Sequence, residues 1–397
     1  MNRTALACTS IASLAIIAGA ALISSRVTAG PLDPPSGAVA STYKTLTEVE
    51  PRIAINATNT PGDADSLYRI TQPGAYYLTR SVAGIINKSG IEVAASGVSI
   101  DLNGFELVGA TGTITTYGIF ASVSGLQGVE VRNGTVRDWG GIGVNLSTNV
   151  VSSGRVTGVR ALDNVGIGMS VHSRFIIDDC TASGNGDGGF SAINECVFTG
   201  CVAANNDGLG FNAVNGPAFS HCTAYGNGAG GFACGNNARV LACTSNSNDT
   251  WGISSGVGGL VADCVVASNT TNGIVADSNA IVLRNTCEGN GSGAGSGAGI
   301  YAWSDARIEG NHCTGNDRGI EVVGSRTRVD GNSCTGNGVS FDIGGSDNIV
   351  LRNTATGGSP NSLIGAGNSV APRVSVADSD GWSGITNANH PWANFGH

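Results

Sequence analysis

The stretch Phe175–Glu195, "FIIDDCTASGNGDGGFSAINE", is one period of a 21-residue repeat that runs from about Val159 to Gly358. Its asparagine recurs every 21 residues, the spacing widens once to 26, and it then returns to 21. A unit that repeats this often is one supersecondary element stacked on its own copies. The asparagines of this column are Asn164, Asn185, Asn206, Asn227, Asn248, Asn269, Asn290, Asn316 and Asn337.

Three further columns of residues share this period. One is made of cysteines: Cys180, Cys201, Cys222, Cys243 and Cys264. A first apolar column contains Ile177, Phe198, Phe219, Val240, Val261, Val282, Ile308, Val329 and Val350. A second apolar column contains Met169, Phe190, Phe211, Phe232, Ile253, Ile274, Ile300, Ile320 and Phe341.

The repeat unit is not helical, because Gly-Asn and Gly-Gly pairs interrupt every segment long enough to form a helix. Short alternating pieces such as "GIEVV" and "SFDIG" favour strands. Three short strands and three turns fill about 21 residues, which is one coil of a parallel β-helix. Coils stack at the strand spacing of about 4.8 Å, so each column becomes a ladder inside the protein. We therefore predict an all-β, single-domain solenoid of about twelve coils with an internal asparagine ladder.

The coil Ala306–Ser325, "ARIEGNHCTGNDRGIEVVGS", matches the pattern I-x-x-N-x-x-x-x-N-x-x-G-I. In this it resembles the right-handed parallel β-helix proteins of the NosD-like and pectate-lyase-like superfamily, of a secreted bacterial type. The resemblance covers roughly residues 81–358. It implies a right-handed coil and no particular activity, because the matching residues all build coils.

The segments outside the repeat have other compositions. Residues 1–29 resemble a cleavable signal peptide, with Arg3, an apolar run, and small residues at Val27 and Ala29. Residues 30–42 are expected to be a linker and 43–80 an N-terminal cap. Residues 81–358 are expected to form the β-helix, and 359–397 a C-terminal cap or tail. No later run is long and apolar enough to span a membrane, so a secreted, periplasmic or cell-surface location is expected.

Charge argues against a nucleic-acid partner. The chain has 20 basic and 29 acidic residues, a net charge of −9. Removing residues 1–29 leaves 18 basic residues and a net charge of −11, with Lys44 and Lys88 as the remaining lysines. A surface of this composition has no basic path along which a phosphate backbone could lie.

The 11 cysteines allow three interpretations. Buried free thiols that fill the core are favoured, because cysteine behaves as a small apolar residue. Stacked Cα atoms also lie within the reach of a disulfide, so pairing along a column stays open. A metal ladder is disfavoured because no CxxC pair is present. No cofactor is predicted, and Ca²⁺ is left open without a specific motif.

The pectinolytic members of the resembled superfamily have catalytic signatures that can be sought here. Asp178-Asp179 matches one element of a polygalacturonase-like site, but Gly-His-Gly and Arg-x-Lys are absent. The Trp-x-Asp-His and Arg-x-Pro-x-x-Arg motifs of pectate-lyase-like sites are absent too. Both specific activities are therefore disfavoured.

One outward-facing cluster follows the 26-residue step. Strand alternation places Tyr301, Glu321 and Asp342 outward in successive coils, with Trp303 beside them, whereas earlier coils carry inert residues there. Glu321 and Asp342 are the candidate catalytic pair, and their proximity should raise the pKa of one of them. Glu309 and Asp330 on the next face form a reserve pair. Tyr301, Trp303, Arg318 and Arg326 are candidate substrate-binding residues, since aromatic rings and charged groups suit sugars.

Two functions remain open at this point. The first, which we favour, is a non-catalytic envelope or surface component that binds a polysaccharide or cell-envelope glycan. The second is a polysaccharide lyase or glycoside hydrolase that acts on an extracellular polysaccharide. The alternative to any site is a solvated face on which Arg318 and Arg326 simply neutralise the acids.

Overall fold

The computed structural model describes residues 50–110, 112, 116–148, 151–291, 295, 297–358, 361–375 and 390–396. The chain comprises two units, Met1–Pro51 and Arg52–His397. The predicted signal peptide, linker and first part of the cap lie outside the described residues. The fold reported below is that of the second unit. Among the described residues, no helix is long and apolar enough to cross a membrane.

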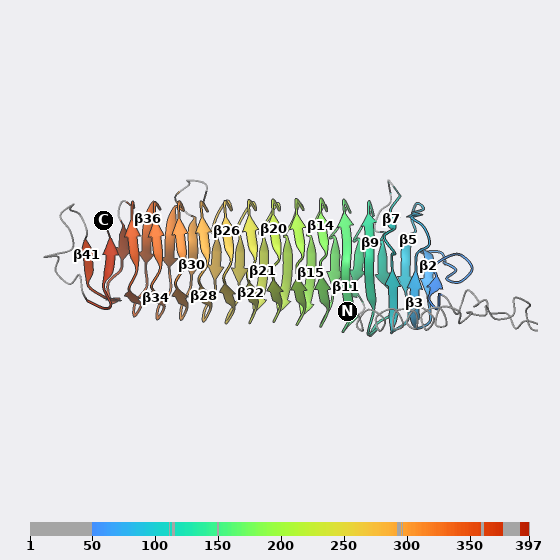
Figure 1. The fold of residues 1–397 in the computed structure, drawn as a ribbon, viewed down its shortest axis with the longest axis horizontal. Coiled ribbons are helices and arrows are strands. Elements are labelled where there is room, and N and C mark those ends of the chain that lie inside the picture. The colour runs from blue at the N-terminus through green and yellow to red at the C-terminus, as the bar shows by residue number, and fades with distance from the viewer. Residues whose placement is uncertain are drawn as a thin grey trace, which may run out of the picture. The chain divides into compact units, whose positions relative to one another are not determined.

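The second unit is a parallel β-solenoid whose strands stack in chain order along one axis (Figure 1). Sheet 1 contains one strand of each coil. Its described strands are β2 (Ser66–Ile70), β5 (Ser89–Val93), β8 (Ile119–Ala121), β10 (Val144–Leu146), β12 (Met169–Val171), β15 (Phe190–Asn194), β18 (Phe211–Asn215), β21 (Phe232–Asn236), β24 (Ile253–Ser255), β27 (Ile274–Ala276), β30 (Ala298–Ala302), β33 (Arg318–Val322), β36 (Val339–Ile343) and β39 (Ser362–Ile364).

Sheet 2 receives two strands from each regular coil. Its described strands are β1 (Ile53–Ala54), β3 (Gly74–Tyr77), β4 (Val82–Ala83), β6 (Val98–Asp101), β7 (Glu106–Val108), β9 (Glu130–Arg137), β11 (Arg155–Leu162), β13 (Ile176–Asp178), β14 (Thr181–Ser183), β16 (Val197–Thr199), β17 (Val202–Ala204), β19 (Ala218–Ser220), β20 (Thr223–Tyr225), β22 (Arg239–Leu241), β23 (Thr244–Asn246), β25 (Leu260–Ala262), β26 (Val265–Ala267), β28 (Ile281–Leu283), β29 (Thr286–Glu288), β31 (Arg307–Glu309), β32 (His312–Thr314), β34 (Arg328–Asp330), β35 (Ser333–Thr335), β37 (Ile349–Leu351), β38 (Thr354–Thr356), β40 (Ser369–Val370), β41 (Arg373–Ser375) and β42 (Asn394–Gly396).

The predicted repeat is confirmed, but the predicted number of coils is too low. Sheet 1 has fourteen strands among the described residues, and the solenoid has about 15 turns rather than twelve. Parallel stacking already begins with β1 and β2 and continues through β39, outside residues 81–358. These terminal coils lack the cysteine column and the Asn164–Asn337 column, so only their strand pairing marks them. The capping roles of the two terminal segments stay predictions.

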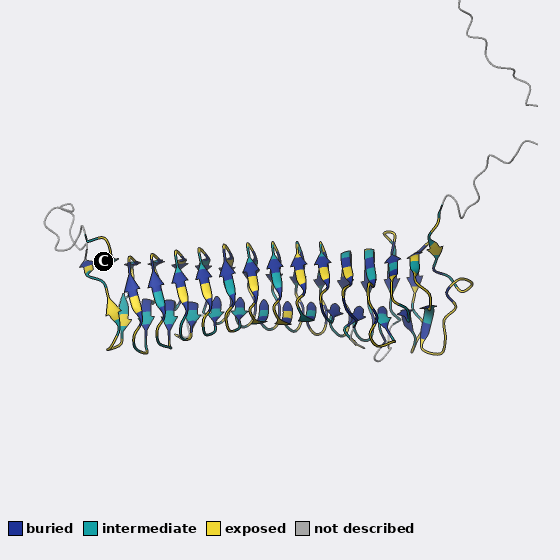
Figure 2. Cartoon of the chain, turned by 90° about the horizontal axis from the view of Figure 1, so that it is seen from below, coloured by how far each residue is buried: buried dark blue, intermediate teal, exposed yellow. Residues whose placement is uncertain are grey.

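The core consists of stacked apolar side chains between the sheets, and buried positions recur in strand after strand (Figure 2). Phe190, Phe211 and Phe232 form one nearly parallel stack, with ring centroids 4.9 and 4.7 Å apart. Phe198 and Phe219 from sheet 2 meet this stack edge-on. The predicted phenylalanine column is therefore confirmed, and each aromatic pair contributes about 0.5–1.5 kcal/mol beyond the area it buries.

The asparagine ladder from Asn164 to Asn337 is also confirmed. Asn206 Nδ2 donates to Asn227 Oδ1 at 2.9 Å, and its backbone N–H donates to the same oxygen at 3.2 Å. The amide also donates to the carbonyl of Ala182 at 3.1 Å. Each asparagine thus satisfies backbone groups of a buried corner that would otherwise lack partners. The ladder continues across the 26-residue step, where Asn290 Nδ2 donates to Asn316 Oδ1 at 3.0 Å.

The cysteine column lies at a second buried corner. The ten described cysteines, Cys180 to Cys334, are buried and free, so no disulfide links them. Cys201 Sγ–H donates to the carbonyl of Ile177 at 3.3 Å, and Cys264 to that of Val240 at 3.6 Å. Cys201 and Cys264 therefore donate hydrogen bonds to the previous coil and also fill the core. Cys8 lies outside the described residues.

The C-terminal motif "NHPWANF" (Asn389–Phe395) completes this second corner. Asn394 Oδ1 accepts hydrogen bonds from the backbone N–H of Asn353 at 2.9 Å and from its Nδ2 at 3.3 Å. The Arg352 guanidinium lies over the Trp392 ring, 5.1 Å from its centroid. Strand β42 pairs in parallel with β38. The motif thus returns the chain to the solenoid and adds one rung to its ladder.

Candidate functional site

The outward cluster predicted from sequence is assembled on sheet 1. Strands β27, β30, β33 and β36 are in register, so Val275, Tyr301, Glu321 and Asp342 are successive Cα partners. Inward neighbours such as Ile300, Ile320 and Phe341 hold these strands against the core. Tyr301, Trp303, Arg318, Glu321 and Asp342 are called the site face from here on.

Aromatic surface forms one half of the site face. Trp303 is 48% exposed. Its ring meets that of Tyr301 edge-on, with centroids 6.0 Å apart and an interplanar angle of 80°. Edge-to-face packing restrains both rings, so the Trp303 face stays available without a large loss of side-chain freedom on binding.

Charged groups form the other half. Arg318 Nε donates to Asp342 Oδ2 at 2.9 Å, whereas its Nη1 lies 3.9 Å from Glu321 Oε2. Arg318 therefore neutralises Asp342 directly and Glu321 only weakly. The Glu321 side chain is 17% exposed, so a carboxylate with incomplete pairing lies half-buried beside Tyr301.

Burial is the main reason that the pKa of Glu321 is raised above its ordinary value. The Arg318 charge lowers this pKa, and the Asp342 charge raises it. One acid of the pair thus has a raised pKa, as predicted, but the main cause is burial rather than the proximity of Asp342. Burial and the Glu321 charge together raise the pKa of Tyr301, so this phenol stays protonated and can donate a hydrogen bond.

The insert after Asn290 contacts the same coil. Asp317 Oδ2 accepts hydrogen bonds from the backbone N–H groups of Gly295 at 3.0 Å and Gly297 at 3.2 Å. Arg318 Nη1 donates to the carbonyl of Gly295 at 2.8 Å. Arg318 thus joins the insert to Asp342, which places the described part of the insert at the edge of the site face.

Two parts of the predicted site lie elsewhere. Glu309 and Asp330 are Cα partners on sheet 2, but Asp330 is only 1% exposed and its carboxylate is bonded by Arg328 and Arg352. Glu309 is bonded by Arg307. Arg326 pairs with Asp305 at 2.7 Å, not with the candidate acids. Strand alternation predicts which way a side chain points. It does not predict whether a neighbouring arginine binds the carboxylate at its end.

The sequence analysis missed Trp251, which occupies in its own coil the position that Arg318 has in β33. A Cβ on Gly230 would meet the Trp251 ring 2.3 Å away, so this ring lies over the glycine of the preceding coil. Nearby, small outward side chains leave a shallow depression of about 270 Å³ over Asn212, Val214, Ala233, Gly235 and Ser254. Gly252 bends the chain before the strand, so simple alternation counted from Ile253 assigns Trp251 to the wrong side.

No group of three or more His, Cys, Asp or Glu side chains that could hold a metal is found within the part of the chain that the structure describes. The site face holds two carboxylates, both of them beside Arg318. Its groups can provide aromatic stacking and hydrogen bonds, and Glu321 is the more weakly paired of the two acids.

Comparisons with known proteins identify the fold. The A-modules of the Azotobacter vinelandii mannuronan C-5 epimerases AlgE4 and AlgE6 superpose with TM-scores of 0.52 and 0.54 at 17% sequence identity. The matches cover 75% and 76% of this chain and 91% of each epimerase module. No family model and no curated protein sequence matches. These similarities show the fold, a right-handed parallel β-helix, as the coil sequence predicted.

Proposed function

We propose that the protein is a secreted, non-catalytic envelope or surface component whose site face binds an extracellular polysaccharide or cell-envelope glycan. The observation that carries the proposal is the exposed Trp303, packed edge-on against Tyr301 and next to the incompletely paired Glu321. An exposed indole face stacks on the apolar face of a pyranose ring. Glu321 and Arg318 then offer an acceptor and donors to the sugar hydroxyls.

The direction of the site face supports a polymer rather than a single sugar. Its residues come from three successive coils about 4.8 Å apart, and the depression over Ala233 continues along the same sheet. A chain lying along the solenoid axis would meet all of these positions. The mannuronan epimerases with this fold act, by their name, on a polysaccharide, and the proposal extends only that substrate class to this chain.

The test is affinity electrophoresis of the purified protein in gels that contain single polysaccharides from a neutral and acidic panel. We expect Trp303→Ala and Glu321→Gln to reduce the retardation at least fivefold without lowering the melting temperature. Tyr225→Ala is the matched control for the tryptophan, because Tyr225 is 49% exposed on sheet 2. Glu309→Gln is the matched control for Glu321→Gln, because Glu309 lies on sheet 2 and outside the site face. The proposal fails if both site variants are retarded as strongly as the parent.

The enzymatic alternative rests on a different observation. Burial raises the pKa of Glu321, as a general acid in glycoside cleavage requires, and Asp342 is its partner in register. Release of reducing ends and absorbance of unsaturated uronates over the same panel would detect hydrolysis and lyase activity. Turnover that Glu321→Gln abolishes and Glu309→Gln keeps would replace the non-catalytic proposal.

A further inference from the structure

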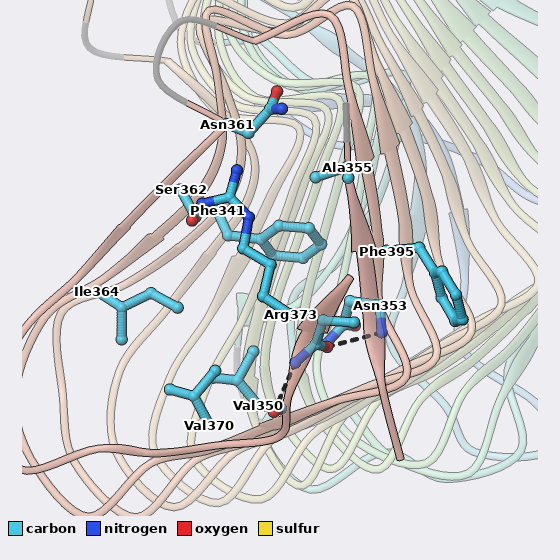
Figure 3. Close-up of a pocket in the computed structure, with 12 residues that line it drawn as sticks. Phe341, Val350, Asn353, Ala355, Asn361, Ser362, Ile364, Val370, Arg373 and Phe395 are labelled. Atoms are coloured by element: carbon cyan, nitrogen blue, oxygen red, sulfur yellow. Dashed lines mark hydrogen bonds between the residues drawn. The ribbon is translucent and has the colours of Figure 1, made fainter. Parts of the chain in front are cut away.

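The C-terminal end of the solenoid contains a pocket that is separate from the site face (Figure 3). Its walls are the side chains of Phe341, Val350, Ala355, Ile364 and Val370. The pocket has about 410 Å³ of empty space when its open mouth is included. The centre of a water molecule can occupy about 50 Å³ of it. Among the described residues, the apolar column of the core ends here, and no further full coil covers its last side chains.

The mouth of the pocket is polar. Figure 3 shows Arg373 of β41 reaching past Phe341 towards Asn361 and Ser362. The amide of Asn394, another lining residue, already has partners, because its Nδ2 donates to the carbonyls of Val350 and Ala371, both at 3.2 Å. Arg373 is exposed, and within the described residues its guanidinium has no ion pair or hydrogen bond. The mouth therefore offers an uncompensated cation above an apolar chamber.

We propose that this pocket binds a small carboxylate with a compact apolar body, such as an aromatic or branched short-chain acid. The carboxylate would accept two parallel hydrogen bonds from the Arg373 guanidinium, the geometry for which this side chain is built. The apolar body would enter between Phe341 and Val350 and displace water that the apolar walls bind poorly. A free sugar would leave hydroxyls unpaired against these walls, so the pocket selects a different ligand class from the site face.

The ligand is limited in size by the pocket. Few heavy atoms fit into the enclosed part, so a dissociation constant in roughly the millimolar range is expected. Benzoate is a suitable probe, and benzamide is its matched neutral analogue of nearly the same shape. The difference in affinity between benzoate and benzamide measures the contribution of the Arg373 charge.

The experiment measures binding of both probes to the full chain by ligand-observed NMR at constant salt. We expect benzoate to bind at least fivefold more tightly than benzamide. Arg373→Gln should remove this preference without changing the melting temperature, because Arg373 is exposed. Arg239→Gln is the matched control, since Arg239 is also an exposed arginine of sheet 2 and should leave the preference intact. Val370→Trp should weaken the binding of both probes, because the larger side chain narrows the mouth of the pocket.

Three outcomes would overturn the proposal. Equal binding of benzoate and benzamide would show that Arg373 does not select a carboxylate. An unchanged preference in Arg373→Gln would place the bound anion elsewhere. Sedimentation of the same samples measures self-association. If the parent self-associates and Val370→Trp abolishes this, the occupant of the pocket is a second copy of the chain.

Discussion

The backbone N–H of Cys264 donates a hydrogen bond to Oδ1 of Asn285 at 2.9 Å, and these two residues occupy the same corner position in successive coils. Five cysteines precede this junction, and Asn285, Asn311, Asn332, Asn353 and Asn394 continue the column after it. Cys264 Sγ–H donates to the carbonyl of Val240, and Asn285 Nδ2 donates to that of Val261. Thiols and amides therefore satisfy equivalent carbonyls, and the amides also bond to one another along the column.

The first prediction concerns this junction. Cys264→Asn should keep or raise the free energy of unfolding, because the new amide can bond to Val240, Cys243 and Asn285 as the asparagines beyond it do. Cys264→Ala should lower it by about 1–2 kcal/mol, because the carbonyl of Val240 loses a donor and the core loses a sulfur atom. Urea denaturation of both variants checks the order. A Cys264→Asn variant less stable than Cys264→Ala would contradict the equivalence of the two side chains.

The asparagine ladder should be costly to interrupt. Asn227 accepts hydrogen bonds from the backbone N–H and Nδ2 of Asn206, and it donates to the carbonyl of Ala203 at 3.1 Å. We expect Asn227→Ala to lower the free energy of unfolding by about 3 kcal/mol, since it leaves buried backbone groups without partners. Asn212→Ala on the exposed face is the control and should change it by less than about 0.5 kcal/mol. Similar losses of stability in Asn227→Ala and Asn212→Ala would show that water replaces the hydrogen bonds of Asn227.

Asp330 should prove structural rather than catalytic. Burial alone would raise its pKa, but hydrogen bonds and charges from Arg352 and Arg328 outweigh burial and hold the pKa below its ordinary value. Asp330→Asn should therefore lower the free energy of unfolding at neutral pH by about 2 kcal/mol and leave glycan binding unchanged. Asp305→Asn, which breaks the exposed pair with Arg326, should cause little change.

The pH dependence of the Asp330 variant follows from the sign of this shift. A carboxylate whose pKa is lowered in the folded state stabilises the fold above its unfolded pKa, about 3.9, and this stabilisation is lost as the pH falls through the folded pKa. The difference between the parent and Asp330→Asn should thus be full at neutral pH and shrink in strong acid. A difference that grows on acidification would contradict the ion-pair explanation.

Glu321 should behave in the opposite way. Its pKa is raised in the folded state, so the folded protein binds more protons than the unfolded chain between the ordinary pKa and the raised one, and stability falls as pH rises through this interval. Glu321→Gln should equal the parent at low pH and be more stable above the interval. Asp342→Asn should lower the pKa of Glu321, because it removes a repelling charge. Thermal unfolding from pH 4 to 8, with NMR titration of Glu321, checks both expectations.

Thiol accessibility is the fifth prediction. Burial raises the pKa of Cys196 and Cys234, which keeps these thiols protonated and slow to react in the folded protein. Unreduced protein should show almost no reaction with a thiol reagent when folded. In denaturant, the ten described cysteines should all react. Fewer than six reactive thiols in the denatured protein would show that several of these cysteines form disulfides.

Much of the site face could be predicted from sequence alone. The period aligns Tyr301, Glu321 and Asp342, because a residue one period away must lie in the next coil of any solenoid. The same arithmetic identified the phenylalanine stack and the asparagine ladder. It also placed the five-residue excess after Asn290, whose described glycines Gly295 and Gly297 contact Asp317.

Other features depended on contacts that no period encodes. The terminal coils carry β1, β2 and β39 without the repeated columns, so they became visible only through strand pairing. Asp330 and Arg326 were placed by neighbouring charges that cover or capture them. The sequence by itself thus determined which residues stack, because stacking follows from equal coil length. The tertiary structure alone decided which stacked groups are buried, paired or left open, because that depends on side chains from neighbouring columns and on where the last coil ends.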